Sequence, residues 1–147
     1  MSRAAAIILH GNEIALIKRR RDGRLYYVFP GGQIEEEETP EQTTIREVEE
    51  ELGLKVDIER LLIKVALHSK LQYYFLARIR GGKFGTGSGP EMQGLYPPER
   101  GSYRPVWMPV SNVLKENVVP REVAEIVFRS TREGWPSDPI SIAKKER

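Results

Sequence analysis

The sequence contains no cysteine among its 147 residues. This absence excludes disulfide bonds, thiolate metal ligands and a cysteine nucleophile, and it fits a reducing compartment, so we expect a cytoplasmic protein. Long apolar runs are also absent. The N-terminal run "AAAIIL" has only six residues, too few for the core of a signal peptide or for a membrane span. We therefore expect a protein with no membrane partner.

A strong excess of either charge is absent as well. The chain has 23 Lys and Arg against 21 Asp and Glu, a net charge of +2, which excludes the strong positive field typical of nucleic-acid-binding proteins. The charges are nevertheless segregated, because basic residues cluster in 18–24 ("KRRRDGR") and acidic ones between Glu35 and Glu51. This segregation allows two patches of opposite sign to face one cleft.

Glycine and proline divide the first third of the chain into short elements. The stretch from Ala4 to Phe29 reads as three strands separated by turns at 11–12 and 22–23. The following "PGG" at 30–32 is predicted to turn the chain, since proline cannot donate to a ladder and glycine permits unusual backbone angles. A strand-rich start to the domain follows from this pattern.

The rest of the chain alternates between strands, a loop and a helix. Residues 55–68 and 71–80 are rich in β-branched and aromatic side chains and are predicted to be strands. Seven glycines and three prolines predict a long loop at 81–104. The end of the chain is predicted to contain a short strand at 105–110, a helix at 120–134 and a flexible tail from about 135.

Together these elements predict one domain over 1–147 in the α/β (α+β) class, with a mixed sheet covered by helices. The clearest single element is a helix from about Pro40 to Leu52. Thr39 suits its N-cap, Gln42 completes a capping box, and Gly53 suits the position after its end.

Three glutamates share one face of this predicted helix. Glu47, Glu50 and Glu51 are spaced i, i+3 and i+4, which places them within about 100° of arc. The opposite face carries apolar residues that can pack on a sheet: Ile45, Val48 and Leu52.

The glutamate spacing opposes helix stability. Glu47 and Glu51 repel at i, i+4, and Glu49 to Glu51 crowd the C-terminal turn, where the helix dipole favours positive charge. Such local violations tend to mark functional sites, and a divalent cation would compensate them. Three hard oxygen ligands suit Mg²⁺, which commonly bridges carboxylates to substrate phosphates. On spacing alone, a solvated acidic helix face remains the competing interpretation.

A longer motif favours the functional interpretation. Five residues separate Gly32 from Glu38, seven more precede Arg46, and "REVEEELGL" then runs to Leu54. This pattern resembles the Nudix box at every fixed position, and the likeness extends over about residues 3–54. The resemblance implies an α/β/α sandwich that cleaves a nucleoside diphosphate linked to another group, using Mg²⁺ or Mn²⁺.

The resemblance also implies roles for individual residues. Glu47, Glu50 and Glu51 would bind the metal with the carbonyl of Gly32. Glu38 and Arg46 would support that arrangement.

The general base and the substrate ligands are less sharply defined. The base would be Glu50 or Glu91, although Glu91 reads equally well as an ordinary loop glutamate. Arg19, with Gly31 and Gly32 beside it, is a candidate substrate ligand, and a solvated edge-strand arginine is the alternative for Arg19.

The substrate is the least determined part of the prediction. The small size favours a nucleoside triphosphate pyrophosphohydrolase, with damaged nucleotides among its candidate substrates. A dinucleoside polyphosphate hydrolase, an ADP-ribose hydrolase and a non-catalytic nucleotide sensor are alternatives. Homodimerisation is allowed by the resemblance, without a diagnostic interface pattern.

Overall fold

The computed structural model describes residues 2–89 and 98–144. Its strands are β1 Arg3–His10, β2 Glu13–Arg21, β3 Arg24–Val28, β4 Gly31–Gln33, β5 Leu54–Leu67, β6 Lys70–Gly82, β7 Ser102–Pro109, β8 Val118–Val119 and β9 Ile140–Lys144. Its helices are α1 Pro40–Leu52 and α2 Arg121–Glu133, with short 3₁₀ turns η1 Pro98–Arg100 and η2 Val110–Asn112.

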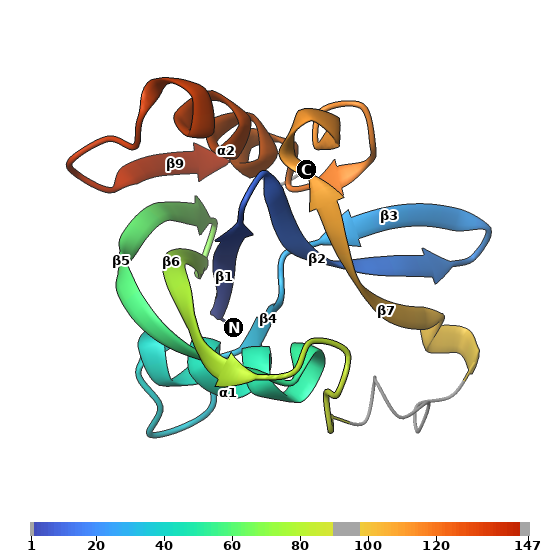
Figure 1. Ribbon diagram of the computed structural model, residues 1–147. Coiled ribbons are helices and arrows are strands. Elements are labelled where there is room, and N and C mark those ends of the chain that lie inside the picture. Colours follow the sequence, from blue (N-terminus) through green and yellow to red (C-terminus); the bar gives the residue numbers. More distant parts are fainter. Residues whose placement is uncertain (1, 90–97, 145–147) are drawn as a thin grey trace.

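The strands form one curled, mixed sheet between the two helices (Figure 1). Its order is β8-β3-β2-β1-β6-β5-β9, with β4 added to β1 and β7 added to β2. The β1–β6, β5–β9 and β3–β8 pairs are parallel and the others antiparallel. The predicted fold class is confirmed.

Strand β1 separates two hydrophobic cores. Ile7 packs in the core that includes the apolar residues of α2, whereas Ala6 and Ile8 pack in the core that includes Val48 and Leu52 of α1. Neighbouring side chains of a strand point to opposite faces, so this alternation places the sheet between the helices. The layered arrangement follows directly from an unbroken apolar run in β1.

The sheet opens between β1 and β2. These strands pair only beside their connecting turn, at Leu9–Ile14 and His10–Glu13. Beyond that point β1 pairs with β4 and β6, while β2 pairs with β3 and β7. The start of β1 and the end of β2 therefore diverge (Figure 1).

Helix α1 has the predicted bounds and caps. The Thr39 side chain accepts a hydrogen bond from the Gln42 backbone amide, and the Gln42 side chain accepts one from the Thr39 backbone amide. Gly53 adopts a left-handed conformation after the last turn. The amides of Gly85 and Gly89 donate to the carbonyls of Leu52 and Glu50, each at 2.9 Å. Residues 83–89 therefore cover the helix end.

Three predictions about connecting segments are incomplete or wrong. Gly31–Gln33 is not only a turn, because it pairs antiparallel with β1 opposite Arg3–Ala5. The loop expected at 81–104 is shorter, since β6 extends to Gly82 and β7 begins at Ser102. The flexible tail expected from about 135 contains β9, which pairs along five positions of β5. Each error has the same cause: the partner strand is distant in sequence.

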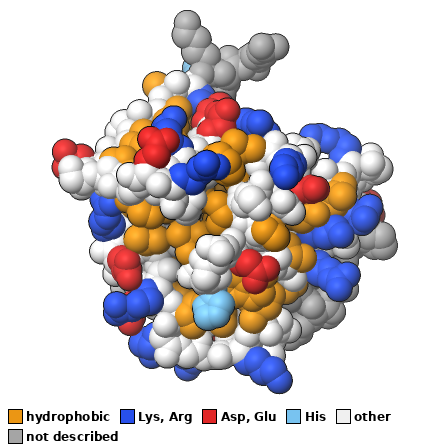
Figure 2. Space-filling view, turned by 45° about the horizontal axis from the view of Figure 1, so that its top comes forward, with side chains coloured by type: hydrophobic (Ala, Val, Ile, Leu, Met, Phe, Trp, Pro, Cys, Tyr) orange, Lys and Arg blue, Asp and Glu red, His pale blue; other side chains and the backbone are white. Residues whose placement is uncertain are grey.

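The side of the molecule that carries α2 exposes hydrophobic side chains between charged ones (Figure 2). A groove of about 640 Å³ there is lined by residues that include Leu9, Phe128 and Trp135. Neither described helix has the length and apolar content needed to span a bilayer.

Candidate active site

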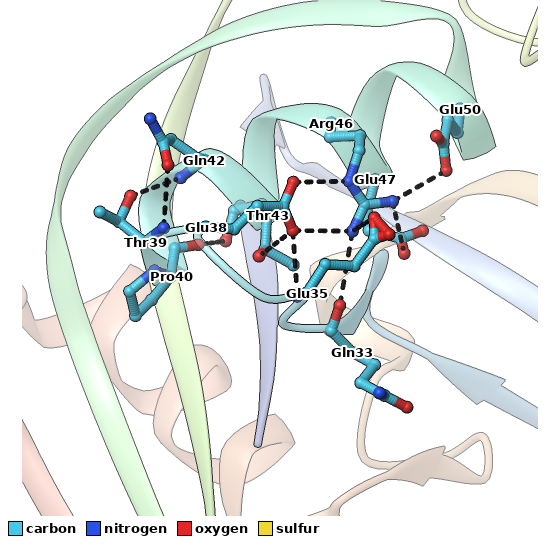
Figure 3. Close-up of polar contacts among 11 residues, drawn as sticks. Gln33, Glu35, Glu38, Thr39, Pro40, Gln42, Thr43, Arg46, Glu47 and Glu50 are labelled. Carbon is cyan, nitrogen blue, oxygen red and sulfur yellow. Dashed lines mark hydrogen bonds and ion pairs between the residues drawn. The ribbon is translucent and has the colours of Figure 1, made fainter. Parts of the chain in front are cut away.

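Arg46 connects the acidic residues around α1 (Figure 3). Its guanidinium donates to both oxygens of Glu38, at 2.8 and 3.1 Å, and to carboxylate oxygens of Glu47 and Glu50, each at 3.2 Å. Glu35 lies 3.4 Å away as a further ion pair. One cation thus lies between the charges of Glu38, Glu47 and Glu50. The hydrogen bond to Glu38, together with the charges of Glu47 and Glu50, raises the pKa of Arg46.

Glu38 accepts hydrogen bonds from three different residues. It accepts from Arg46, from the Thr43 hydroxyl at 2.8 Å and from the Glu35 amide at 3.1 Å. The hydrogen bond from Arg46 is the main reason that the pKa of Glu38 falls to about 2, against a smaller opposing effect of burial. Glu38 therefore remains ionised and anchors Arg46 beside α1.

Glu47 and Glu51 approach the backbone of β4. A carboxylate oxygen of Glu51, which is 6% exposed, accepts from the Gly31 amide at 2.8 Å. The Glu47 carboxylate lies so close to Gly32 that a Cβ there would collide with it. Glycine at position 32 is thus required by the carboxylate rather than by the backbone angles, and β4 forms a cradle for both side chains.

A cleft of about 340 Å³ opens beside these carboxylates. Its acidic wall consists of Glu47 and Glu51 with the β4 backbone. Its other charged lining is basic and consists of Arg3, Arg19 and Arg100. The cleft occupies the region where the start of β1 and the end of β2 diverge, so it combines hard oxygen ligands with cations that suit phosphate groups.

The predicted site residues are not all brought together. Glu47, Glu51, Gly31, Gly32 and Arg19 line the cleft, with Arg46 and Glu38 behind its acidic wall. The Glu50 side chain is directed to Arg46 and is not part of the lining. Within residues 2–89 and 98–144, no three His, Asp or Glu side chains come close enough to hold a metal ion by themselves. Position 91, the alternative base, lies outside the described residues.

The sequence interpretation missed three contributors to the site. Thr43 is fully buried and holds Glu38, and its place one turn after the N-cap was the available signal. Arg3 and Arg100 lack any local signal, since they reach the cleft only through the pairing of β1 with β4 and of β7 with β2.

Comparisons with known proteins agree with this geometry. A family model described as the NUDIX domain matches residues 1–126. The chain is 32% identical over 143 residues to an RNA pyrophosphohydrolase of Teredinibacter turnerae, covering 82% of this chain and 81% of that protein. It is 39% identical over 66 residues to an 8-oxo-dGTP diphosphatase of Escherichia coli, covering 44% of this chain and only 46% of that enzyme.

The fold comparison covers almost the whole chain. A NUDIX hydrolase from Nitrosomonas europaea superimposes with a TM-score of 0.76 at 19% identity, over 99% of this chain and 78% of that one. At this identity the likeness concerns the fold. The named activities of the two sequence relatives both concern pyrophosphate bonds in nucleotide derivatives.

Proposed function

Because the chain belongs to the NUDIX family, we propose that it hydrolyses a pyrophosphate bond in a nucleotide derivative with the help of divalent metal ions. The observation that carries this proposal is the cleft that is lined both by the acidic wall of Glu47 and Glu51 and by arginines. A diphosphate group is the ligand that such walls suit, because it can bind metal ions and guanidinium groups at the same time.

The residues present fit a metal ion such as Mg²⁺ or Mn²⁺. Mg²⁺ in phosphate-processing sites is commonly held by one or two carboxylates together with substrate phosphates and water. Glu47 and Glu51 supply such a pair, and the Gly32 carbonyl is the third ligand in this proposal. The Gly31 amide donates to one Glu51 oxygen, which holds this carboxylate beside the Gly32 backbone. Glu50 would join by turning from Arg46.

The chain's own groups do most of the positioning. When bound, divalent ions would neutralise phosphate oxygens and lower the pKa of the attacking water. The β4 backbone fixes Glu47 and Glu51, and Arg46 keeps the Glu47 carboxylate oriented beside α1. Arg3 and Arg100 face the same cleft and would hold the substrate's negative charge.

Glu50 is the preferred candidate for the general base. Its side chain is 35% exposed, so water reaches it, and its only described side-chain partner is Arg46 at 3.2 Å. A proton acceptor must contact the water that attacks phosphorus, and Glu50 can turn from Arg46 toward the cleft. Glu91 remains the alternative, and comparing Glu50→Gln with Glu91→Gln would decide between them.

A nucleoside triphosphate is the preferred substrate, cleaved to a monophosphate and pyrophosphate, as expected from the small size. The likeness to an 8-oxo-dGTP diphosphatase supports this choice. The second candidate is the triphosphorylated 5′ end of an RNA. It is favoured by the longer alignment with the RNA pyrophosphohydrolase and by the exposed arginines at the ends of β2 and β3.

One panel would test the proposal against a non-catalytic nucleotide sensor. Nucleoside triphosphates, 8-oxo-dGTP, ADP-ribose, a dinucleoside polyphosphate and 5′-triphosphorylated RNA would be incubated with Mg²⁺, with Mn²⁺ and with chelator. We expect metal-dependent release of pyrophosphate from at least one triphosphate. Binding without turnover across the panel would establish the sensor instead and overturn the proposed activity.

A further inference from the structure

Arg19 is held between two aromatic rings. In the sheet register it lies directly opposite Tyr26 of β3 and Tyr103 of β7. Its guanidinium carbon is 3.7 Å from the centre of the Tyr103 ring and 5.7 Å from that of Tyr26. Stacking on Tyr103 fixes the plane of the guanidinium, which limits the directions in which its N–H groups can point.

The fixed guanidinium binds the backbone of a turn. Its Nε donates to the carbonyl of Ser102 at 3.1 Å, and one terminal nitrogen donates to the carbonyl of Arg100. Between these residues, Gly101 adopts φ +79°, and a Cβ there would collide with the carbonyl oxygen of Arg20. The turn from Arg100 to Ser102 is therefore seated against β2 at the point where Arg19 holds it.

This turn carries an arginine into the cleft. The Arg100 side chain lines the same cleft as Glu47 and Glu51. Arg19 donates to the Arg100 carbonyl, so Arg19 fixes the backbone of Arg100 and with it the base of the Arg100 side chain. Two of the N–H groups of Arg19 already donate to carbonyls. Arg100 is an exposed residue of the cleft lining.

We infer that Arg100 binds the substrate phosphates and that Arg19 is a positioning residue that acts through Arg100. This inference rests on the proposed function. It differs from the sequence-based prediction, in which Arg19 itself was the substrate ligand.

The substitution Arg19→Lys distinguishes two roles for Arg19, direct binding of phosphate and positioning of the turn. If Arg19 contacts phosphate as a cation, lysine would retain much of the effect. If it positions the turn, lysine would fail nearly as badly as glutamine, because only a planar fork can bridge two carbonyls while stacking on Tyr103. We expect Arg19→Lys and Arg19→Gln to raise KM similarly, by about fivefold to tenfold, with kcat changed by less than about twofold.

A double-mutant cycle tests the coupling directly. We expect Arg100→Gln to raise KM about tenfold and the added Arg19→Gln change to have little further effect, since the residue through which it acts is gone. The inference would be overturned if the double variant raised KM by the product of the two single effects. It would also be overturned if the KM of Arg19→Lys were nearly that of the unmodified protein. Arg78→Gln, at an exposed strand arginine that does not line the cleft, is the matched control and should leave KM unchanged.

A binding measurement separates this inference from the proposed activity. Calorimetry with inorganic pyrophosphate and Mg²⁺ requires no turnover. If the proposed activity is wrong but the inference is right, Arg100→Gln and Arg19→Lys will weaken pyrophosphate binding while no panel member is hydrolysed. If both variants bind pyrophosphate as well as the unmodified protein, the inference is wrong whatever the activity.

Discussion

The two walls of the cleft are built in different ways. The acidic wall comes from a single segment, in which β4 and α1 place Gly32, Glu47 and Glu51 within 20 positions of one another. The basic wall is assembled from the start of β1, the end of β2 and the η1 turn, so its arginines at 3, 19 and 100 meet only in the folded sheet. The acidic wall is therefore formed by residues that are close in sequence, whereas the basic wall depends on how distant strands are arranged in the sheet.

This difference also separates their proposed contributions, with metal binding on one side and substrate binding on the other. The largest expected effect is therefore on the acidic wall. Glu51→Gln can still accept the Gly31 hydrogen bond but lacks the charge, so we expect kcat to fall at least about 100-fold with the fold intact. Pyrophosphate release measured against Mg²⁺ concentration would show this. The exposed neighbour Glu49, changed to Gln, should behave like the parent.

Gly32→Ala tests the same wall without removing a charge. The added methyl would displace the Glu47 carboxylate, the end of a flexible side chain, so we expect activity to fall about tenfold while the melting temperature changes little. Gly81→Ala is the control, because a Cβ at Gly81 meets nothing within 4 Å. A fully active Gly32→Ala variant would show that the position of Glu47 is not limiting.

Arg3→Gln tests the basic wall away from the Arg19 turn. Arg3 is exposed at the start of β1, so its interaction with phosphate is screened by water and should be modest. We expect KM to rise about threefold and kcat to stay within about twofold, measured by steady-state kinetics. A loss confined to kcat would contradict the division of roles between the walls.

The smallest effect concerns the support of the acidic wall at low pH. Because the folded-state pKa of Glu38 is lowered from 4.5 to about 2, its contribution to stability is present above pH 4.5 and is lost as the pH falls toward 2. Glu38→Gln should therefore melt at a lower temperature than the parent near pH 6. The two melting curves should converge between pH 4.5 and 2, and a constant difference would contradict this account.

The sequence predicted what local physics determines. The bounds of α1 followed from Thr39, Gln42 and Gly53, and the two-sided packing followed from the apolar face of the helix. The cleft does combine both charges, but of the basic cluster at 18–24 only Arg19 lines it, and the other two arginines of the lining come from outside that cluster. Cytoplasmic location and homodimerisation remain predictions.

The remainder depended on contacts between distant segments. The β4 pairing with β1 and the β9 pairing with β5 have no signal within their own few residues. The direction of Glu50 was also not predictable, since helical spacing alone placed it with Glu47 and Glu51, whereas Arg46 draws it aside. The spacing in the sequence predicts the helix face that carries a side chain. The contacts with neighbouring residues determine the direction in which that side chain points.

Arg46 gives the chain a built-in counter-ion at the place where a metal would bind. Proteins whose carboxylates repel one another without such a partner depend on their metal in order to fold. Here the Arg46 guanidinium already binds Glu38, Glu47 and Glu50, so we expect the chain to fold before a metal ion binds. Removal of metal by a chelator should therefore abolish activity without unfolding the protein. The cellular supply of metal would then determine the active fraction of the protein rather than the amount of folded protein.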